Sequence, residues 1–182
     1  MIVYSWNVRG LNSPLKQHEV VNLMKKNKMD VSGFIETKMN SSKVAYMHKF
    51  RLKHWKFLTN VGACSNARIV VFWNPSMVKV ELLDCLAQGL NVTINSLVHP
   101  FSFTATLVYG FNTIVARRSL WEDLRGWWPN YPWLVIGDFN LVLSQGDKHN
   151  GEPVSNYKVL DFRSCCADLG LNDLNYMGCH FT

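Results

Sequence analysis

The sequence predicts an α/β protein of the mixed α+β kind, folded as one domain over residues 1–182. The chain opens with an apolar strand, an amphipathic helix and a second apolar strand. Its middle, from Trp55 to Tyr109, consists of successive apolar segments separated by turn residues, and a short apolar strand near Trp133 lies between two helical segments. With 182 residues and 48% hydrophobic content, the chain can bury a sizeable core.

The amino-terminal part predicts a β-α-β unit. Ile2–Trp6 reads as a strand, and Val31–Ile35 is the next short apolar run, with Glu36 directly after it. Between them, Ser13 is a suitable N-cap for a helix over residues Pro14 to about Lys28, because proline is tolerated at the first helical position. We therefore expect the first two strands to lie in one sheet.

The middle of the chain predicts a short helix and then a series of strands. The helix covers Ser41–Phe50. The strands are Trp55–Val61, Arg68–Trp73, Val78–Cys85, Leu90–Leu97 and Phe101–Tyr109. Turn formers such as Asn74-Pro75 and His99-Pro100 separate them, which is typical of an antiparallel meander.

The carboxyl-terminal part predicts two helices around one strand. The helices cover Arg117–Trp128 and Val154–Leu169, and Gly170 is the expected C-cap of the second. The inward face of that helix is predicted to be formed by Val159, Leu160, Phe162 and Cys166. Because Trp133–Ile136 is wholly apolar, it is expected to be a fully buried strand. Leu171–Thr182 resembles the approach to a further strand.

The charge and the cysteine content limit the possible binding partners and the cellular compartment of the protein. The net charge is +6, and residues 1–60 hold eleven Lys and Arg against three acidic residues. This asymmetry favours a polyanion such as nucleic acid, and the alternative is a solvated basic face. Five cysteines without a CxxC pair predict a reducing, intracellular environment. No leader and no apolar run long enough for a membrane helix is found, so no membrane partner is expected.

Polar residues follow four of the predicted strands. Asn7 follows the first strand, Glu36 follows the second, Tyr109 comes at the end of the fifth strand of the run, and Asp138 with Asn140 follows the strand at Trp133–Ile136. Each has an ordinary structural explanation as a turn residue, a solvated strand end or a core aromatic. Together, at strand ends that can share one sheet edge, they indicate a site.

The donor atoms in this set suggest a particular metal and reaction. Carboxylate and amide oxygens suit Mg²⁺, whereas zinc would favour histidine and cysteine ligands. The expected chemistry is metal-assisted phosphodiester cleavage, with a carboxylate that orients or deprotonates a water. Mn²⁺ is an alternative ion.

These residues resemble a known family. The segments Ser5–Leu11, Glu36–Lys38, Tyr109–Gly110 and Gly137–Asn140, in that order, are similar to the motifs of the endonuclease/exonuclease/phosphatase superfamily. The finer sequence of Arg68–Pro75 and Asp147–Ser155 resembles the amino-terminal endonuclease of plant LINE-type non-LTR retrotransposons.

The resemblance implies a four-layer sandwich of two packed mixed β-sheets flanked by helices, and it implies roles for the site residues. Glu36 would be the Mg²⁺ carboxylate, with Asn7 beside it. Asp138 would orient or deprotonate the attacking water, and Asn140 would fix Asp138 and contact the phosphate. Tyr109 would stabilise charge on the phosphoryl oxygens.

The resemblance also implies a basic surface along the DNA backbone, formed by Arg9, Lys38 and Lys148. The chain departs from the family in one respect, because its sequence stops before the terminal strands and the Ser-Asp-His motif. None of the six histidines lies in a matching context. The expectation is therefore a domain whose last strands are missing and whose activity is impaired.

Three functions remain open on these grounds. The first is a Mg²⁺-dependent DNA endonuclease of a LINE-type retrotransposon, acting in the nucleus without an obligate protein partner. The second is a non-catalytic nucleic-acid-binding remnant, which the basic amino-terminal half would support. The third is a small-molecule phosphoesterase, since the fold does not fix the substrate.

Overall fold

The computed structural model describes residues 1–129, 132–141 and 155–174, which fall into two compact units. The first unit comprises Met1–Tyr109 and Pro129–Asp138, and the second comprises Gly110–Trp128 and Phe139–Thr182. Within the described residues, no helix is long and apolar enough to cross a membrane.

One sheet of the first unit contains the predicted β-α-β unit. Its strands are, in spatial order, β1 (Val3–Asn7), β2 (Val31–Met39), β4 (Ala67–Trp73) and β3 (Lys56–Thr59). β1 and β2 pair in parallel, so the prediction that the first two strands share a sheet is confirmed. β4 runs antiparallel to both β2 and β3.

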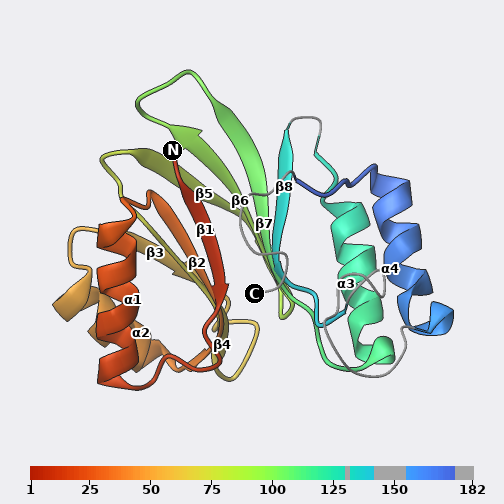
Figure 1. Ribbon diagram of the computed structural model, residues 1–182, viewed down its shortest axis with the longest axis horizontal. Coiled ribbons are helices and arrows are strands. Elements are labelled where there is room, and N and C mark those ends of the chain that lie inside the picture. Colours follow the sequence, from red (N-terminus) through yellow and green to blue (C-terminus); the bar gives the residue numbers. More distant parts are fainter. Residues whose placement is uncertain (130–131, 142–154, 175–182) are drawn as a thin grey trace. The chain divides into compact units, whose positions relative to one another are not determined.

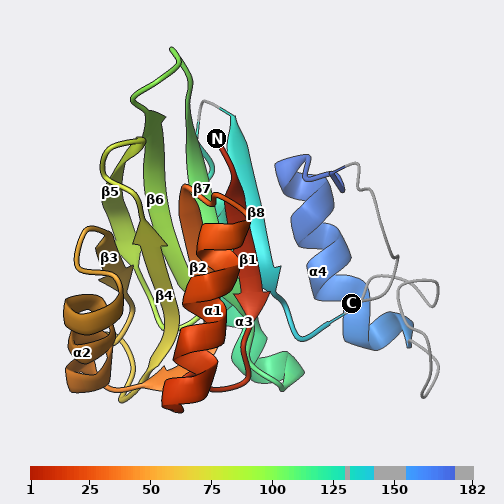
Figure 2. The ribbon, with the colours of Figure 1, turned by 60° about the vertical axis from the view of Figure 1, so that its left-hand side comes forward.

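Two helices cover one face of this sheet, as Figures 1 and 2 show. They are α1 (Pro14–Lys26) and α2 (Ser41–Arg51). Their apolar faces and the sheet form one cluster of buried side chains, which includes Val20, Met24, Val44, Met47 and Phe72. Burial of these side chains fixes the helices against the sheet, because each fully buried aliphatic side chain contributes roughly 1.5–3 kcal/mol.

The second sheet of this unit has the order β5 (Val78–Cys85), β6 (Gly89–Ser96), β7 (Ser102–Tyr109) and β8 (Trp133–Asp138). β5, β6 and β7 form antiparallel pairs, whereas β8 is parallel to β7. The prediction of one continuous meander is therefore wrong in part, because β3 and β4 belong to the first sheet. Both edges of β4 are occupied by β2 and β3, so β5 cannot pair with β4, the strand before it in the sequence.

Trp133–Ile136 forms a strand as predicted, but the prediction that this strand is fully buried is wrong. The side chains of β8 are half-buried, because β8 is the edge strand of its sheet. Trp133 nevertheless donates from its indole nitrogen to the hydroxyl of Thr106 on β7 at 2.8 Å. An edge strand exposes more of its apolar residues than a central strand does, and a run of apolar letters alone does not distinguish the two.

The two sheets approach each other closely where β2 faces β7. A Cβ atom on Gly33 would lie 2.0 Å from a methyl carbon of Leu107, so a larger residue at this position of β2 would require the Leu107 side chain to move. Contacts also join β1 to β8, and β4 to β7. The first unit thus contains two packed, mixed four-stranded sheets of the α/β class that the sequence predicts.

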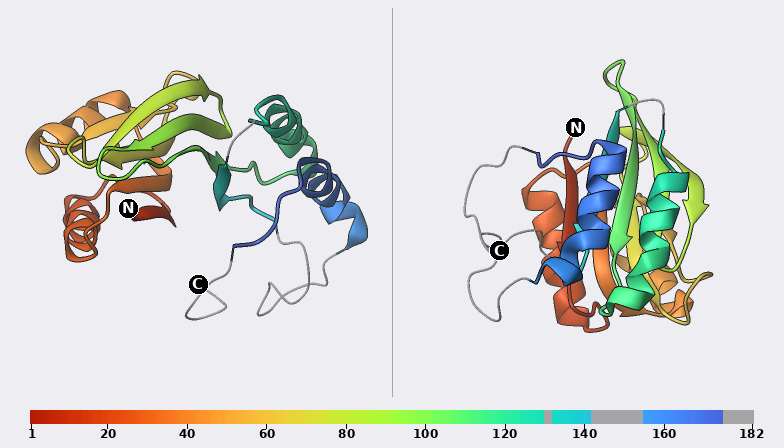
Figure 3. Two further views of the ribbon diagram at one scale, coloured as in Figure 1. Left: turned by 90° about the horizontal axis from the view of Figure 1, so that it is seen from above. Right: turned by 90° about the vertical axis from the view of Figure 1, so that its right-hand side faces the viewer.

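The second unit contains α3 (Ile114–Gly126) and α4 (Asn156–Leu169), which run side by side (Figure 3). Both helices begin at slightly different residues from those predicted, and α3 also ends two residues earlier, whereas α4 ends at Leu169 as predicted. Thr113 and Ser155 cap them by accepting hydrogen bonds from backbone N–H groups, and such caps set the first residue. Gly170 adopts the left-handed conformation of a C-cap, as predicted.

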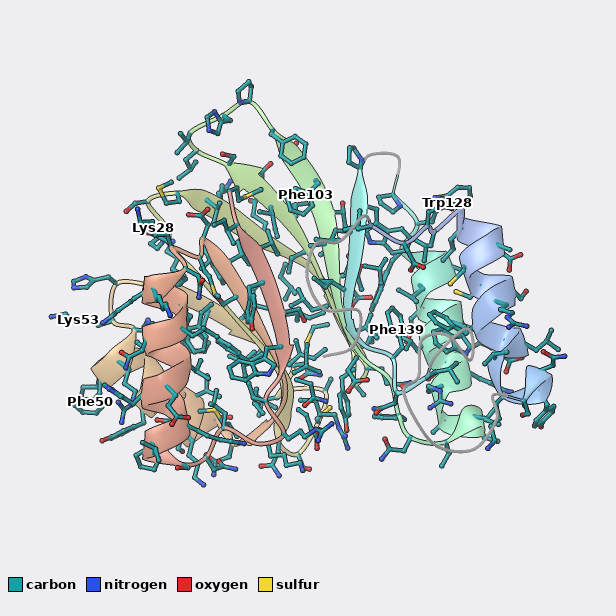
Figure 4. The ribbon with its side chains drawn as sticks, viewed as in Figure 1. Lys28, Phe50, Lys53, Phe103, Trp128 and Phe139 are labelled. Atoms are coloured by element: carbon teal, nitrogen blue, oxygen red, sulfur yellow. The ribbon has the colours of Figure 1, made fainter. Side chains whose placement is uncertain are left out.

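The interface between α3 and α4 is aromatic and differs from the predicted face of α4. Phe139, labelled in Figure 4, packs against Trp121 of α3 and Phe162 of α4. Cys165 is fully buried, whereas Leu160, predicted to face inward, is 62% exposed. Cys166, also predicted to face inward, is only half-buried. Arg125 pairs with Asp168 at 2.7 Å across the outer side of the two helices.

Candidate functional site

The last residues of β1 and β8 meet at one edge of the first unit. Asn7 ends β1 and Asp138 ends β8. The side-chain amide of Asn7 donates a hydrogen bond to the carboxylate of Asp138 at 2.5 Å. Two residues predicted for the site, one from each sheet, are thus in direct contact at the carboxyl ends of their strands, where α/β proteins commonly bind ligands.

Glu36 lies within β2, not after it as the sequence predicts. β2 continues to Met39 through an irregularity between Ile35 and Met39. The loop after β1 remains paired with this segment, because Gly10 donates a backbone hydrogen bond to the carbonyl of Glu36 at 2.7 Å. A bulge of this kind re-aims a side chain at a sheet edge.

The electrostatics of Glu36 are set by Lys38 and Asn7. The Lys38 ammonium lies 2.8 Å from the Glu36 carboxylate, whose side chain is 20% exposed. The hydrogen bond from Lys38 lowers the pKa of Glu36, and a hydrogen bond from Asn7 lowers it further against the opposing effect of burial. The same contact raises the pKa of Lys38. Asn7 therefore contacts both carboxylates, Glu36 and Asp138.

Unusual backbone conformations coincide with the predicted site residues. Five non-glycine residues of the described chain have a positive φ, and four of them were predicted for the site: Arg9, Glu36, Lys38 and Asn140. The fifth is Lys28, which follows Asn27, the C-cap of α1. Left-handed conformations cost roughly 1–3 kcal/mol each, and they are concentrated at functional positions. The backbone conformations thus support a site at these residues, and this support does not depend on the chemistry of their side chains.

Tyr109 ends β7 and is the register partner of Asp138 on β8. Its side chain is buried, and the guanidinium of Arg68 lies 5.2 Å from the centre of its ring. Arg68 comes from β4 of the other sheet. Sequence reasoning did not identify Arg68 as a site residue. The available signal was a charged residue near the start of an otherwise apolar strand.

Asn140 belongs to the second unit. Its side-chain amide donates to the carbonyl of Gly110 at 2.5 Å, and its own carbonyl accepts from Arg117 at 3.0 Å. Arg117 also donates to the carbonyl of Phe111, and burial lowers the pKa of this guanidinium. Arg117 thus holds the segments on either side of the first helix of this unit, a role that the sequence did not suggest. The prediction that Asn140 fixes Asp138 stays a prediction.

The structure describes two of the three residues predicted to bind nucleic acid. Arg9 is exposed, and the side chain of Lys38 is 61% exposed, so both can meet a phosphate backbone. Lys148 lies outside the described residues.

The donor atoms of Glu36, Asn7 and Asp138 fit a hard divalent cation. They offer two carboxylates and one amide oxygen, and Mg²⁺ is held by one or two carboxylates with waters completing its coordination. In residues 1–129, 132–141 and 155–174, no group of three or more His, Cys, Asp or Glu side chains is assembled for a metal. The donor set itself contains neither histidine nor cysteine, the ligands that zinc favours.

The chain matches one protein-family model, and many solved structures have a similar fold. The family model described as Endonuclease/Exonuclease/phosphatase matches residues 4–178. The endonuclease domain of TRAS1, a telomere-specific non-LTR retrotransposon, is similar with a TM-score of 0.68 at 13% identity, over 95% of this chain and 74% of that one. The AP endonuclease LMAP from Leishmania major gives 0.66 at 15% identity, over 91% and 66% of the two chains.

A phosphatase has the same fold. The mannosyl-6-phosphatase of Bacteroides thetaiotaomicron is similar with a TM-score of 0.56 at 12% identity, over 78% of this chain and 66% of that one. At identities this low, the similarity to solved structures establishes the fold and leaves the substrate open.

Proposed function

The chain belongs to the endonuclease/exonuclease/phosphatase family, and on that premise we propose that it is a Mg²⁺-dependent endonuclease that nicks DNA. The observation that carries the proposal is the position of Asn7. Its side chain contacts Glu36 of β2 and Asp138 of β8, so a single amide joins two carboxylates that lie 102 positions apart in the sequence.

The roles of the two carboxylates follow from their surroundings. Glu36 is kept ionised by Lys38 and Asn7, and it is the residue that would hold the cation. Asp138 orients a water against the scissile phosphate and takes up its proton on a carboxylate oxygen. Asn7 orients the Asp138 carboxylate through a hydrogen bond from its amide N–H. When bound, Mg²⁺ supplies Lewis-acid polarisation of a phosphoryl oxygen, and Mn²⁺ is a substitute of similar ligand preference.

Tyr109 and Asn140 complete the proposed machinery. Tyr109 follows the buried part of β7 and stands in register with Asp138, so its hydroxyl stabilises charge on the phosphoryl oxygens. Asn140 contacts the phosphate and supports Asp138, which it follows by two residues in the chain.

The proposed substrate is DNA, and the proposed source is a plant LINE-type retrotransposon. The eleven Lys and Arg within residues 1–60 provide positive charge that attracts a polyanion. Arg9, Lys38 and Lys148 are the residues proposed to contact the phosphate backbone of the DNA. The resemblance of Arg68–Pro75 and Asp147–Ser155 to plant LINE endonucleases supports the source. A target-nicking role places the protein in the nucleus, in a reducing compartment.

The test is nicking of supercoiled plasmid by the full 182-residue chain. We expect nicking with Mg²⁺ or Mn²⁺ and none with a chelator. Glu36→Gln and Asp138→Asn should each lower the rate by about 10²–10⁴-fold. Glu81→Gln is the matched control, because this exposed carboxylate on β5 pairs only with Lys79 among the ion pairs of the described residues.

Two results would redirect the assignment. Hydrolysis of a sugar phosphate without plasmid nicking indicates a small-molecule phosphoesterase. Salt-sensitive DNA binding that survives Asp138→Asn, together with no hydrolysis of any phosphoester tested, indicates a binding protein without catalytic activity.

A further inference from the structure

A small pocket lies beside Glu36. It has a volume of about 150 Å³ and is lined by Glu36, Lys38, Ser65, Asn66, Ala67 and Arg68. The wall thus combines one proposed catalytic carboxylate, two cationic side chains and two short polar residues from the loop before β4. All six belong to the first unit.

Arg68 is held rigidly at this pocket. The side-chain carbonyl of the fully buried Asn60 accepts hydrogen bonds from the backbone N–H groups of Arg68 and Ile69, at 3.0 and 2.9 Å. The side-chain amide of Asn60 donates at 3.2 Å to the carbonyls of Leu86 and Ala87, in the turn between β5 and β6. Asn60 therefore pins the start of β4 to the second sheet.

Tyr109 is fixed from the same turn. Its backbone N–H donates to the carbonyl of Gln88 at 2.9 Å, and its ring contacts the Arg68 guanidinium. A guanidinium over an aromatic ring keeps its plane parallel to or tilted on that ring and leaves its N–H fork directed sideways. The position of Arg68 is therefore set at both its backbone and its head group.

We propose that Arg68 binds the phosphate next to the scissile phosphate, in the pocket that it shares with Glu36 and Lys38. The inference rests on the proposed function and deepens it, since it names a residue for a neighbouring phosphate of the same strand. Arginine presents a fixed fork of N–H donors that matches phosphate oxygens. The Lys38 ammonium is paired with the Glu36 carboxylate, so Arg68 gives the pocket its net positive charge.

The size of the pocket decides which part of a nucleotide enters. Pockets that enclose a whole small-molecule ligand usually measure roughly 300–1,000 Å³. A pocket of about 150 Å³ is smaller than these and accommodates a phosphodiester group, not a base with its sugar. Such a contact gives no sequence preference by itself, because phosphate contacts position a protein and base contacts specify the sequence.

The competing explanation is that Arg68 only supports the ring of Tyr109. The two roles differ in one measurable quantity. A residue that neutralises a phosphate changes the salt dependence of DNA binding, whereas a residue that only supports a neighbouring ring does not.

The experiment measures binding of a fluorescent DNA duplex to the full chain at a series of salt concentrations. It is performed with chelator, so that cleavage does not contribute. We expect Arg68→Gln to bind roughly tenfold more weakly at low salt. The slope of log K against log salt should fall by about 0.9, the value for one lost phosphate contact. Arg68→Lys should keep the slope, because it keeps the charge.

Lys79→Gln is the charge-matched control. Lys79 pairs with Asn95 near the end of β6, which in turn pairs with Ser102 at the start of β7. It therefore lies at the edge of the sheet opposite to Tyr109, and its loss should leave the slope unchanged. Circular dichroism and thermal unfolding establish that each variant is folded.

A measurement on the unaltered chain does not depend on any variant folding. DNA should slow the modification of Arg68 by phenylglyoxal, followed by mass spectrometry. An unchanged salt slope in folded Arg68→Gln, or no protection of Arg68 by DNA, would overturn the inference. Protection and a reduced slope in a chain that binds DNA without nicking it would uphold the phosphate contact while contradicting the proposed endonuclease activity.

Discussion

The side-chain amide of Asn7 donates to the carboxylate of Asp138 across 131 positions of sequence. The two residues end β1 and β8, which belong to different sheets of the first unit. This contact joins the sheets at the edge where Glu36 and Tyr109 also lie. Loss of either partner should therefore affect the site more than it affects the core.

Asn7→Ala removes the amide that contacts both carboxylates. We expect the nicking rate to fall by roughly 10–100-fold, because groups that orient a ligating or catalytic carboxylate usually have effects of this size. The measurement is a double-mutant cycle with Asp138→Ala. The rate loss of the double variant should be smaller than the product of the two single losses. Fully multiplicative losses would show that the two side chains act independently.

Gly137→Ala should destabilise the first unit. Gly137 has a φ of +148°, and an added Cβ would lie 2.1 Å from the carbonyl oxygen of Val108 on β7. We expect the free energy of unfolding to fall by about 3 kcal/mol from the combined backbone and steric costs. Gly62→Ala is the control, because nothing lies within 4 Å of its added Cβ. Chemical denaturation compares the two variants, and equal midpoints would contradict the prediction.

Asn60→Ala should be more damaging than its position in a loop suggests. Its side chain makes hydrogen bonds to four backbone groups, and it is fully buried. We expect a loss of about 3 kcal/mol in the free energy of unfolding, because buried polar groups left without partners are costly. Asn22→Ala, at an exposed position of α1, should change it by less than about 0.5 kcal/mol. A loss below roughly 1 kcal/mol for Asn60→Ala, the value of one ordinary hydrogen bond, would argue against this role.

The stability of the second unit should depend on pH through Cys165. Burial raises the pKa of this thiol from its usual 9.0 to about 11. The folded form therefore favours the protonated thiol, and the resulting stability is complete below pH 9 and is lost as the pH rises through about 11. Thermal unfolding across this range should show a steeper decline for the unaltered chain than for Cys165→Ala. Parallel curves would exclude a contribution from this thiol.

The sequence predicted the parts of the fold that local pattern determines. The β-α-β opening, the order of strands and the Gly170 cap were correct because hydrophobic period and capping chemistry are local properties. The separation of β4 from β5 was missed, since turn residues mark where a strand ends and not which sheet the next strand joins. The half-burial of β8 was missed for a similar reason, because edge position depends on the whole sheet.

Some residues of the candidate site could likewise be recognised from the sequence, and others only from the structure. Asn7, Glu36, Tyr109 and Asp138 were recognisable as polar residues at strand ends, and the structure gathers them in the first unit. Arg68 and Asn60 were not recognisable, because their importance arises from contacts with residues 41 and 26 positions away. The bulge that carries Glu36 was equally hidden, since it requires the loop after β1 to pair with β2.

The pairing of β7 with β8 has a consequence for how the protein is made. β8 is parallel to β7, and the 23 residues between these strands include the whole of α3. A ribosome therefore completes both hairpins of β5 to β7 before Asp138 has been synthesised. Until then, β7 presents an unpaired edge, and such edges invite association with other chains. Nascent protein should be most prone to aggregate in the interval between the synthesis of Tyr109 and that of Asp138.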